Sequence, residues 1–134
     1  MLADDPIFGR FCFGGEWRKI SRGIAVVPRD GLRRRFHAML ETGKLHLVLD
    51  NDRFASEQPI VLRRDFAEIS FQLESDNPAE HVAKLNVSGL SGSYILRGSK
   101  GQIASLKLKE NEEVAAELPM DPSHLQTFEL LKKQ

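Results

Sequence analysis

The sequence is short of the residues that crosslink a small domain or carry it into a membrane. It contains 134 residues with a single cysteine, Cys12, which excludes an intrachain disulfide. The core must therefore be stabilised by packing alone. No apolar run approaches the length of a membrane span, and the opening MLADDPIF lacks the basic start and apolar stretch of a secretion signal. The cellular compartment stays open, because such a sequence is equally typical of a module from a longer chain.

An excess of charge of either sign is also missing. Nineteen Lys and Arg residues balance nineteen Asp and Glu residues, so the formal net charge at pH 7 is zero. No global field therefore draws the chain to nucleic acid or to a membrane. The arginine runs at residues 33–35 and 63–64 predict no dense phosphate-binding patch, because neighbouring residues of a strand point to opposite faces. Neither nucleic acid nor membrane is expected as a partner.

The remaining composition is that of an ordinary globular protein. Hydrophobic residues make up 41% and charged residues 28% of the sequence. A chain of this length buries roughly two-thirds of its unfolded surface in one core. We predict a single domain over residues 1–134, either complete or part of a longer protein.

Short segments of alternating apolar and polar residues, separated by turn signals, predict an all-β fold. The C-terminal half contains three of them at near-even spacing, typical of a β-meander that follows a loop at residues 87–92. These segments are residues 94–97, 103–108 and 114–118. Four more expected strands lie at residues 7–13, 17–20, 24–27 and 59–63.

Residues 67–73 alternate without interruption, and Ala67, Ile69, Phe71 and Leu73 are expected to face inward. Their polar neighbours face water, as in a sheet that is covered on one side only. Together these patterns predict an antiparallel two-sheet β-sandwich, jelly-roll or immunoglobulin-like, of about nine or ten strands.

A hairpin at residues 33–50 has a register that can be derived from its apolar residues. A two-residue turn at Thr42 and Gly43 places them on one face. The resulting pairs are Phe36 with Leu49, Ala38 with Leu47, and Leu40 with Leu45. The same register sets Arg35 opposite Asp50 and makes His37 and His46 diagonal neighbours on the outer face.

Residues 125–132 fit two structures. Ser123 and Gln126 can form the capping box of a short helix. Alternation through Phe128 and Leu130 instead indicates a final strand, which we favour because an isolated two-turn helix has little intrinsic stability.

Two groups of residues were considered as metal ligands. His37 and His46 lie within reach of a shared metal, but no cysteine or acidic residue nearby in sequence completes the set. Asp50, Asn51 and Asp52 offer the oxygen ligands of a calcium loop, although turns favour the same residues for local hydrogen bonds. Calcium binding at this turn stays open, and no metal site or cofactor is predicted.

Several segments carry a resemblance to a known class of proteins. They are VSGLSGSY at residues 87–94, the turn at 98–101, LKLKENEEV at 106–114 and ELP at 117–119. This succession is similar to the last strands of β-sandwich modules that accompany catalytic domains in bacterial carbohydrate-active enzymes. A second resemblance, to C-terminal domains of large glycosidase-like proteins, is carried by Phe8-Gly9, Gly14-Gly15 and residues 28–36. The resemblance implies a non-catalytic accessory or interaction domain whose partner is a catalytic domain of the parent chain, or alternatively a carbohydrate-binding module whose partner is a glycan.

A sugar site needs exposed flat aromatics that stack on pyranose rings. Trp17 and Tyr94 are the only Trp and Tyr. We predict Trp17 as the stacking residue, with the neighbouring Glu16 accepting sugar hydroxyls and Tyr94 as the second candidate. No Ser-His-Asp, Cys-His or two-carboxylate arrangement can be derived from the spacing, so no catalytic residues are predicted and the chain is not expected to be an enzyme.

Overall fold

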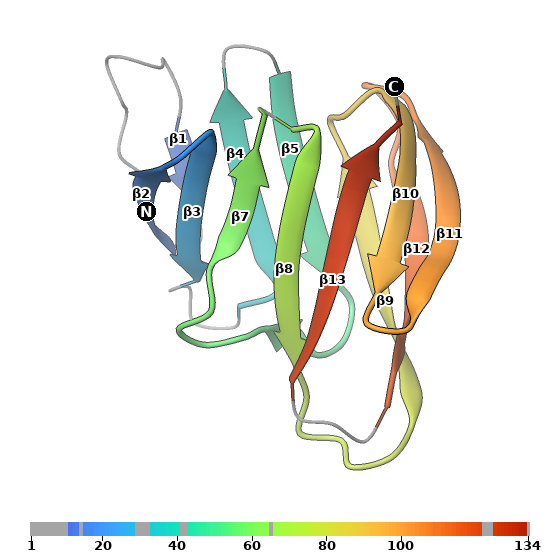
Figure 1. The fold of residues 1–134 in the computed structure, drawn as a ribbon. Coiled ribbons are helices and arrows are strands. Elements are labelled where there is room, and N and C mark those ends of the chain that lie inside the picture. The colour runs from blue at the N-terminus through green and yellow to red at the C-terminus, as the bar shows by residue number, and fades with distance from the viewer. Residues whose placement is uncertain are drawn as a thin grey trace.

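The computed structural model describes residues 11–13, 15–28, 33–40, 43–64, 66–121 and 125–133. This part of the chain forms strands and connecting turns, without a helix (Figure 1). The strands are β1 (Phe11–Phe13), β2 (Gly15–Ile20), β3 (Gly23–Pro28), β4 (Arg35–Leu40), β5 (Gly43–Leu49), β6 (Arg53–Phe54), β7 (Ile60–Arg63), β8 (Glu68–Glu74), β9 (His81–Ser88), β10 (Gly92–Gly98), β11 (Gly101–Leu108), β12 (Val114–Met120) and β13 (Leu125–Lys132). The described residues contain no helix with the length and hydrophobicity that a bilayer span requires.

The strands form two antiparallel sheets that pack against each other. The smaller sheet has the order β1-β4-β5-β9-β12, and the larger has the order β11-β10-β13-β8-β7-β3-β2, with β6 paired to β8. The prediction of an all-β fold with two antiparallel sheets is confirmed. The predicted count of nine or ten strands is wrong, because the described residues form thirteen, including β1 and β6 with three and two residues.

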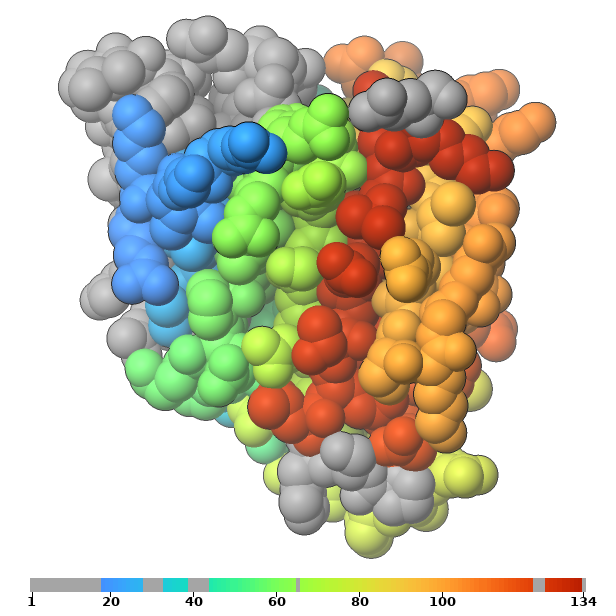
Figure 2. All heavy atoms as spheres, in the orientation of Figure 1, coloured from blue at the N-terminus to red at the C-terminus, as the bar shows by residue number. Residues whose placement is uncertain are grey.

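Consecutive strands connect the two sheets at both edges. Strand β1 of the smaller sheet contacts β2 of the larger sheet, and β11 of the larger sheet contacts β12 of the smaller one. The chain therefore crosses from sheet to sheet where each sheet ends in the described part of the structure. On the outer face of the larger sheet, side chains of β13 lie between those of β8 and β10 (Figure 2).

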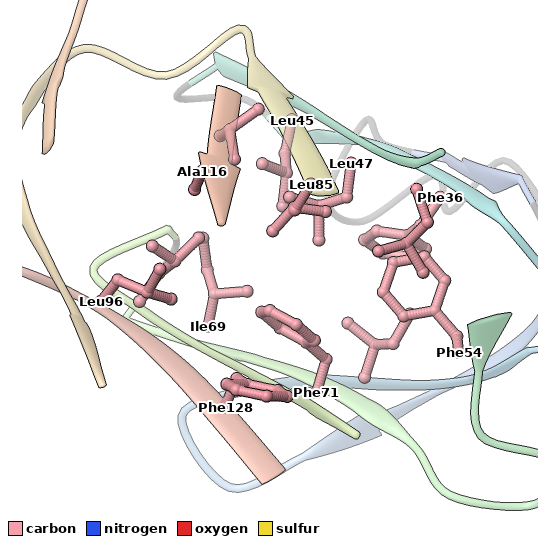
Figure 3. Close-up of a cluster of buried hydrophobic side chains, with 14 of the residues drawn as sticks. Phe36, Leu45, Leu47, Phe54, Ile69, Phe71, Leu85, Leu96, Ala116 and Phe128 are labelled. Carbon is pink, nitrogen blue, oxygen red and sulfur yellow. The ribbon is translucent and has the colours of Figure 1, made fainter. Parts of the chain in front are cut away.

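The core consists of the inward faces of both sheets (Figure 3). Alternation along β8 buries Ile69, Phe71 and Leu73, as predicted, whereas Ala67 precedes the strand and is half-buried. Phe71 contacts Phe54 edge to face, with ring centroids 5.8 Å apart. It also stacks on Phe128 at 5.9 Å. These rings join β6, β8 and β13, and the apolar area that they remove from water stabilises the sandwich.

The hairpin of β4 and β5 is shifted by two residues from the predicted register. Phe36 pairs with Leu47, and Ala38 pairs with Leu45. A shift of two residues leaves every side chain on its face, because the period of a strand is two. Burial of Phe36, Ala38, Leu45, Leu47 and Leu49 is therefore confirmed, whereas the side chain of Leu40 lies outside the described residues.

The same shift corrects two cross-strand pairs. His37 lies directly opposite His46, where the predicted register made them diagonal neighbours. Arg35 lies opposite Val48, so the predicted pair with Asp50 is wrong. The predicted turn at Thr42 and Gly43 is also corrected, because Gly43 already pairs with Leu40 in the ladder.

Two further predictions concern the C-terminal half. Residues 125–132 form β13, paired with β8 on one side and β10 on the other, so the strand interpretation is confirmed. The predicted loop at residues 87–92 is shorter, because β9 extends to Ser88 and β10 begins at Gly92. At Gly89, with a φ of +94°, a Cβ atom would lie 2.5 Å from the carbonyl oxygen of Lys44, so this tight connection requires glycine.

Candidate functional site

Trp17 and Glu16, the predicted sugar-binding residues, lie in β2 at the edge of the larger sheet. Their backbones pair with Val26 and Val27 of β3. The side chains of Trp17 and Glu16 lie outside the described part of the structure.

Tyr94, the second predicted aromatic, is a core residue. Its strand β10 lies between β11 and β13, and the side chain is only 2% exposed. The hydroxyl group donates a hydrogen bond of 2.8 Å to the carbonyl oxygen of Phe66. Burial raises the pKa of Tyr94 to about 12. The prediction that this ring can bind a ligand is corrected, because its faces are covered by the core.

His37 and His46 form a close ring pair on the outer face of the smaller sheet. Their ring centroids are 4.0 Å apart with a tilt of 44°. Burial lowers the pKa of His37, and the positive charges of His46 and Lys44 lower it further. The pair borders a hollow of about 360 Å³ together with the acidic turn at residues 110–113. The described residues contain no group of three or more His, Cys, Asp or Glu that could hold a metal ion.

The turn considered for calcium uses its polar side chains to join β5 to β9. Asp50 Oδ1 accepts a hydrogen bond of 3.1 Å from Asn86 Nδ2. Asn51 donates from Nδ2 to the carbonyl oxygen of Val82 and accepts at Oδ1 from the amide of Lys84, both at 3.0 Å. These oxygens point to separate protein donors, which favours the local hydrogen-bonding interpretation of the turn.

Asp52, the third residue of that turn, pairs with His81 at the start of β9. Asp52 Oδ2 lies 2.7 Å from His81 Nε2, and the carbonyl oxygen of Ala79 lies 2.9 Å from His81 Nδ1. The side chains of His81 and Asp52 are 15% and 6% exposed. With an acceptor at each ring nitrogen, the doubly protonated imidazolium is favoured. The hydrogen bond to Ala79 and then that to Asp52 raise the pKa of His81, against the opposing effect of burial.

His81 also forms part of a hollow at one end of the sandwich, which we call the end pocket. It lies where β9 and β13 begin, β12 ends and β10 turns into β11, toward the lower end in Figure 1. The volume is about 460 Å³. Its lining includes Glu80, His81, Lys100, Ile103, Met120 and Phe128.

A β-bulge shapes the inner wall of the end pocket. Leu96 pairs with Ala104 and Arg97 pairs with Gln102, so Ile103 is an extra residue in β11. Bulges of this kind redirect a side chain from the regular alternation of its strand. A Cβ atom at Gly98 would lie 3.0 Å from Ile103 Cδ1 and 3.5 Å from Phe128 Cε1. The bare backbone at Gly98 therefore lets Ile103 and Phe128 pack closely over the turn.

The loop that leads into His81 is held by charge-assisted hydrogen bonds. Arg53 donates from both terminal nitrogens to the two carboxylate oxygens of Asp76, each at 3.0 Å. Asn77 Oδ1 accepts from the amide of Ala79 at 3.0 Å. This side of the end pocket is thus positioned without a ligand.

Polar side chains at the mouth of the end pocket fall into two groups. Gln126 is engaged at both ends, because Oε1 accepts from the amide of Asp121 at 2.8 Å and Nε2 donates to the carbonyl oxygen of Pro119 at 3.3 Å. Lys100 and Glu80 are exposed and make no ion pair with another described residue. Among the charged side chains of the described lining, Lys100 and Glu80 are exposed, whereas Asp121 is half-buried.

Sequence reasoning did not identify the end pocket, because its walls come from four separate segments between residues 80 and 128. The paired glycines Gly98 and Gly101 around Lys100 were visible as a turn, but nothing local to that turn indicates the residues opposite it. Comparison with protein-family models, curated proteins and solved structures finds no match to this chain.

Proposed function

We propose that this chain is a non-catalytic accessory or interaction domain that binds a ligand or partner through the end pocket. One observation carries the proposal: an apolar inner wall lies beneath a mouth with exposed charged side chains, and the loop that borders one side of it is already held in place. Pockets of roughly 300–1,000 Å³ with apolar walls and a few polar groups are typical of ligand sites. A volume of about 460 Å³ lies within that range.

The side chains of His81 and Gln126 are already hydrogen-bonded within the protein, which supports ligand binding rather than catalysis. A general base must direct a free lone pair toward its substrate. His81 has Asp52 at one ring nitrogen and the carbonyl oxygen of Ala79 at the other, so both nitrogens are engaged within the protein. Both ends of the Gln126 amide bond to the backbone of Pro119 and Asp121 at the end of β12. These side chains position the walls of the pocket.

We further propose that the domain is a jelly-roll or immunoglobulin-like module of a bacterial carbohydrate-active enzyme, with a catalytic domain of the parent chain as partner. Two antiparallel sheets packed face to face agree with the architecture that the sequence resemblance implies. Support from fold is analogy, so the binding experiment below decides the function of the site.

The proposal is tested by blocking the pocket at an exposed strand position. Val82 borders the end pocket and is 48% exposed, so Val82→Arg adds bulk and charge at little cost in stability. Ala115→Arg is the matched control, because Ala115 is an exposed residue of the same sheet outside the pocket. The probes are leucine, L-phenylalanine, 3-cyclohexyl-L-alanine and cellobiose.

We expect at least one probe to shift the methyl resonances of Ile103 and Met120 in carbon-13 correlation spectra. Val82→Arg should abolish the shifts, and Ala115→Arg should preserve them. If every probe leaves both methyl groups unchanged, or if both arginine variants behave alike, the end pocket is not the binding site and the proposal is overturned.

Carbohydrate binding at Trp17 and Glu16 is the second candidate. It is favoured by the position of Trp17 in β2, which has a hydrogen-bonded neighbour, β3, on one side only among the described strands. Trp17 is the sole tryptophan, so indole fluorescence reports on this position alone. Titration with plant, bacterial and host oligosaccharides should change the emission if a sugar stacks there. Unchanged emission together with absent heats of binding by calorimetry would reject this candidate.

A further inference from the structure

The loop at residues 75–80, which we call the β8–β9 loop, carries the chain from the larger sheet to the smaller one. It lies at the lower end of the sandwich in Figure 1. Its first half is held by the two hydrogen bonds that Arg53 donates to Asp76. Its second half leads directly into His81, whose ring contacts the carbonyl oxygen of Ala79. The two halves of the loop are thus held by different groups, and only the second half depends on a histidine.

The ring of His81 lies between two acceptors that belong to different elements. Nε2 is 2.7 Å from Asp52 Oδ2 in the turn after β5, and Nδ1 is 2.9 Å from the carbonyl oxygen of Ala79 in the β8–β9 loop. A protonated imidazole donates at both nitrogens, whereas a neutral imidazole has one N–H and one lone pair. Both contacts are therefore hydrogen bonds only while the ring is charged.

Loss of the proton should break the contact with Ala79 and keep the contact with Asp52. The carboxylate of Asp52 is charged and its side chain is only 6% exposed, so it retains the remaining N–H of the ring. Nδ1 then directs a lone pair at a carbonyl oxygen 2.9 Å away, and two acceptors at this distance repel each other. Ala79 is exposed, so its carbonyl group is able to turn toward water instead.

Charged side chains of the surrounding elements do not reverse this preference. Besides Asp52, they are Arg34, Arg53, Asp76, Glu80, Lys100 and Asp121. Three cations among them offset three anions, and Asp52 is the one carboxylate of the described residues that is bonded to the ring. The hydrogen bonds to Ala79 and Asp52 raise the pKa of His81 above its ordinary value of 6.5. The contact with Ala79 should therefore persist at pH 6.5 and be lost as pH rises further.

We propose that His81 is a pH-dependent switch in the β8–β9 loop: the imidazolium holds the peptide group between Ala79 and Glu80, and the neutral ring releases it. The first half of the loop stays in place in both states, because Arg53 and Asp76 hold it independently of the ring. The switch is local, and it leaves the sandwich folded on both sides of the transition.

Release of this peptide group should alter the border of the end pocket. Glu80 and Val82 flank His81 in the chain, and all three residues line the pocket. A wall that is already ordered costs less to fix on binding, so a ligand should bind more tightly on the acid side of the transition. This consequence rests on the proposed function of binding through the end pocket, whereas the switch itself does not.

Nitrogen-15 relaxation of the whole chain without ligand tests the switch from about pH 5 to 9. The amide of Glu80 reports on it directly, because this N–H belongs to the same peptide group as the carbonyl of Ala79. Its order parameter should fall from about 0.85 toward 0.6, with a midpoint that matches the titration of the His81 ring. The amide of Asp76 is the internal control, and it should stay rigid throughout.

Variants assign the transition to one ring. Asp52→Asn removes the negative charge, so it should move the ring titration and the loss of Glu80 order together to lower pH. His81→Gln should abolish the pH dependence, because an amide does not titrate in this range. His37→Gln is the matched control and should leave the midpoint unchanged. His124 lies outside the described residues, and His124→Gln separates its titration from that of His81.

The outcomes separate the switch from the proposed function. Equal order of the Glu80 amide on both sides of the His81 titration overturns the switch, as does a transition that persists in His81→Gln. L-Phenylalanine and cellobiose, titrated on each side of the midpoint, test the consequence for binding. A bound probe should have a dissociation constant about 2- to 5-fold larger on the alkaline side in the wild type, and an equal one in His81→Gln. Equal constants in the wild type overturn that consequence alone. If neither probe binds, the consequence fails as well, and the ligand-free relaxation still decides the switch.

Discussion

The pKa of histidine is shifted in opposite directions at the end pocket and on the outer face of the β4–β5 hairpin. His81, beside the pocket, has an acceptor at each ring nitrogen, and the pKa of its imidazole is raised. His37, on the hairpin, lies 4.0 Å from the ring of His46 and near Lys44, and the pKa of its imidazole is lowered. Burial lowers the pKa at both positions and is the main cause at His37, whereas at His81 the two hydrogen bonds outweigh it.

The difference determines how pH acts on each region. A histidine with a raised pKa stabilises the fold below its unfolded value of 6.5, and that contribution is lost as pH rises through the folded pKa. A histidine with a lowered pKa acts in reverse: the fold loses stability as pH falls below 6.5 toward the folded value. The two regions should therefore respond to opposite directions of pH change around neutrality.

The core beneath the hairpin provides the largest expected effect. Leu47 is fully buried and follows His46 in β5, so the two side chains lie on opposite faces of one strand. Leu47→Ala should cost roughly 2–5 kcal/mol by leaving a cavity. His46→Ala should cost less than about 1 kcal/mol, because it removes a ring from the outer face. Equal shifts of the two urea midpoints would show that the assignment of faces is wrong.

Burial in this hairpin was predictable although its register was not. Apolar alternation specifies which face of a strand is inward, and it is satisfied equally by registers that differ by two residues. The predicted register and the observed one therefore bury the same leucines. Which one forms depends on how Leu40 is connected to Gly43, and alternation carries no information about that connection. The same criterion located β8 and β13 correctly, because each strand has one inward apolar face.

The site was less accessible to sequence reasoning than the fold. Asp52 and His81 are 29 residues apart, and their contact exists only because β5 pairs with β9. Ile103 looked like an ordinary member of an alternating strand, because a bulge is a property of two paired strands and not of one sequence. Tyr94 was considered for a ligand because it is rare in the sequence. Its position between two neighbouring strands, which buries it, is a long-range property.

The second prediction tests the histidine beside the end pocket. Asp52→Asn keeps an acceptor for His81 but removes the negative charge, and it should cost about 1–2 kcal/mol near pH 6. The cost should shrink as pH rises through the raised pKa of His81, because the neutral ring no longer gains from the carboxylate. Asp50→Asn is the control, since Asp50 is exposed and bonds to Asn86. A cost independent of pH would contradict an imidazolium at His81.

The third prediction concerns the buried hydroxyl group of Tyr94, which is hydrogen-bonded within the protein. Tyr94→Phe keeps the ring and removes the hydrogen bond to Phe66, so it should cost about 0.5–1.5 kcal/mol. Because burial raises the pKa of Tyr94 to about 12, the unfolded chain ionises first, and wild-type stability should fall as pH rises above 10. Denaturant titrations at increasing alkaline pH should show this loss in the wild type and a smaller one in the variant. Equal alkaline losses would exclude Tyr94 as their source.

The smallest expected effect is at the histidine pair, and it is a change in how steeply stability depends on pH. His37 faces His46 and Lys44, while carboxylates of the turn at residues 110–113 border the same hollow. His37→Gln should leave stability at pH 8 almost unchanged and reduce the loss of stability between pH 6.5 and 5. His81→Gln should do the opposite, removing a contribution that is present at pH 6. Urea midpoints of the wild type and both variants, measured across this range, compare the two regions directly. If both variants change the acid slope in the same direction, the neighbours of the two rings do not set their charge as described.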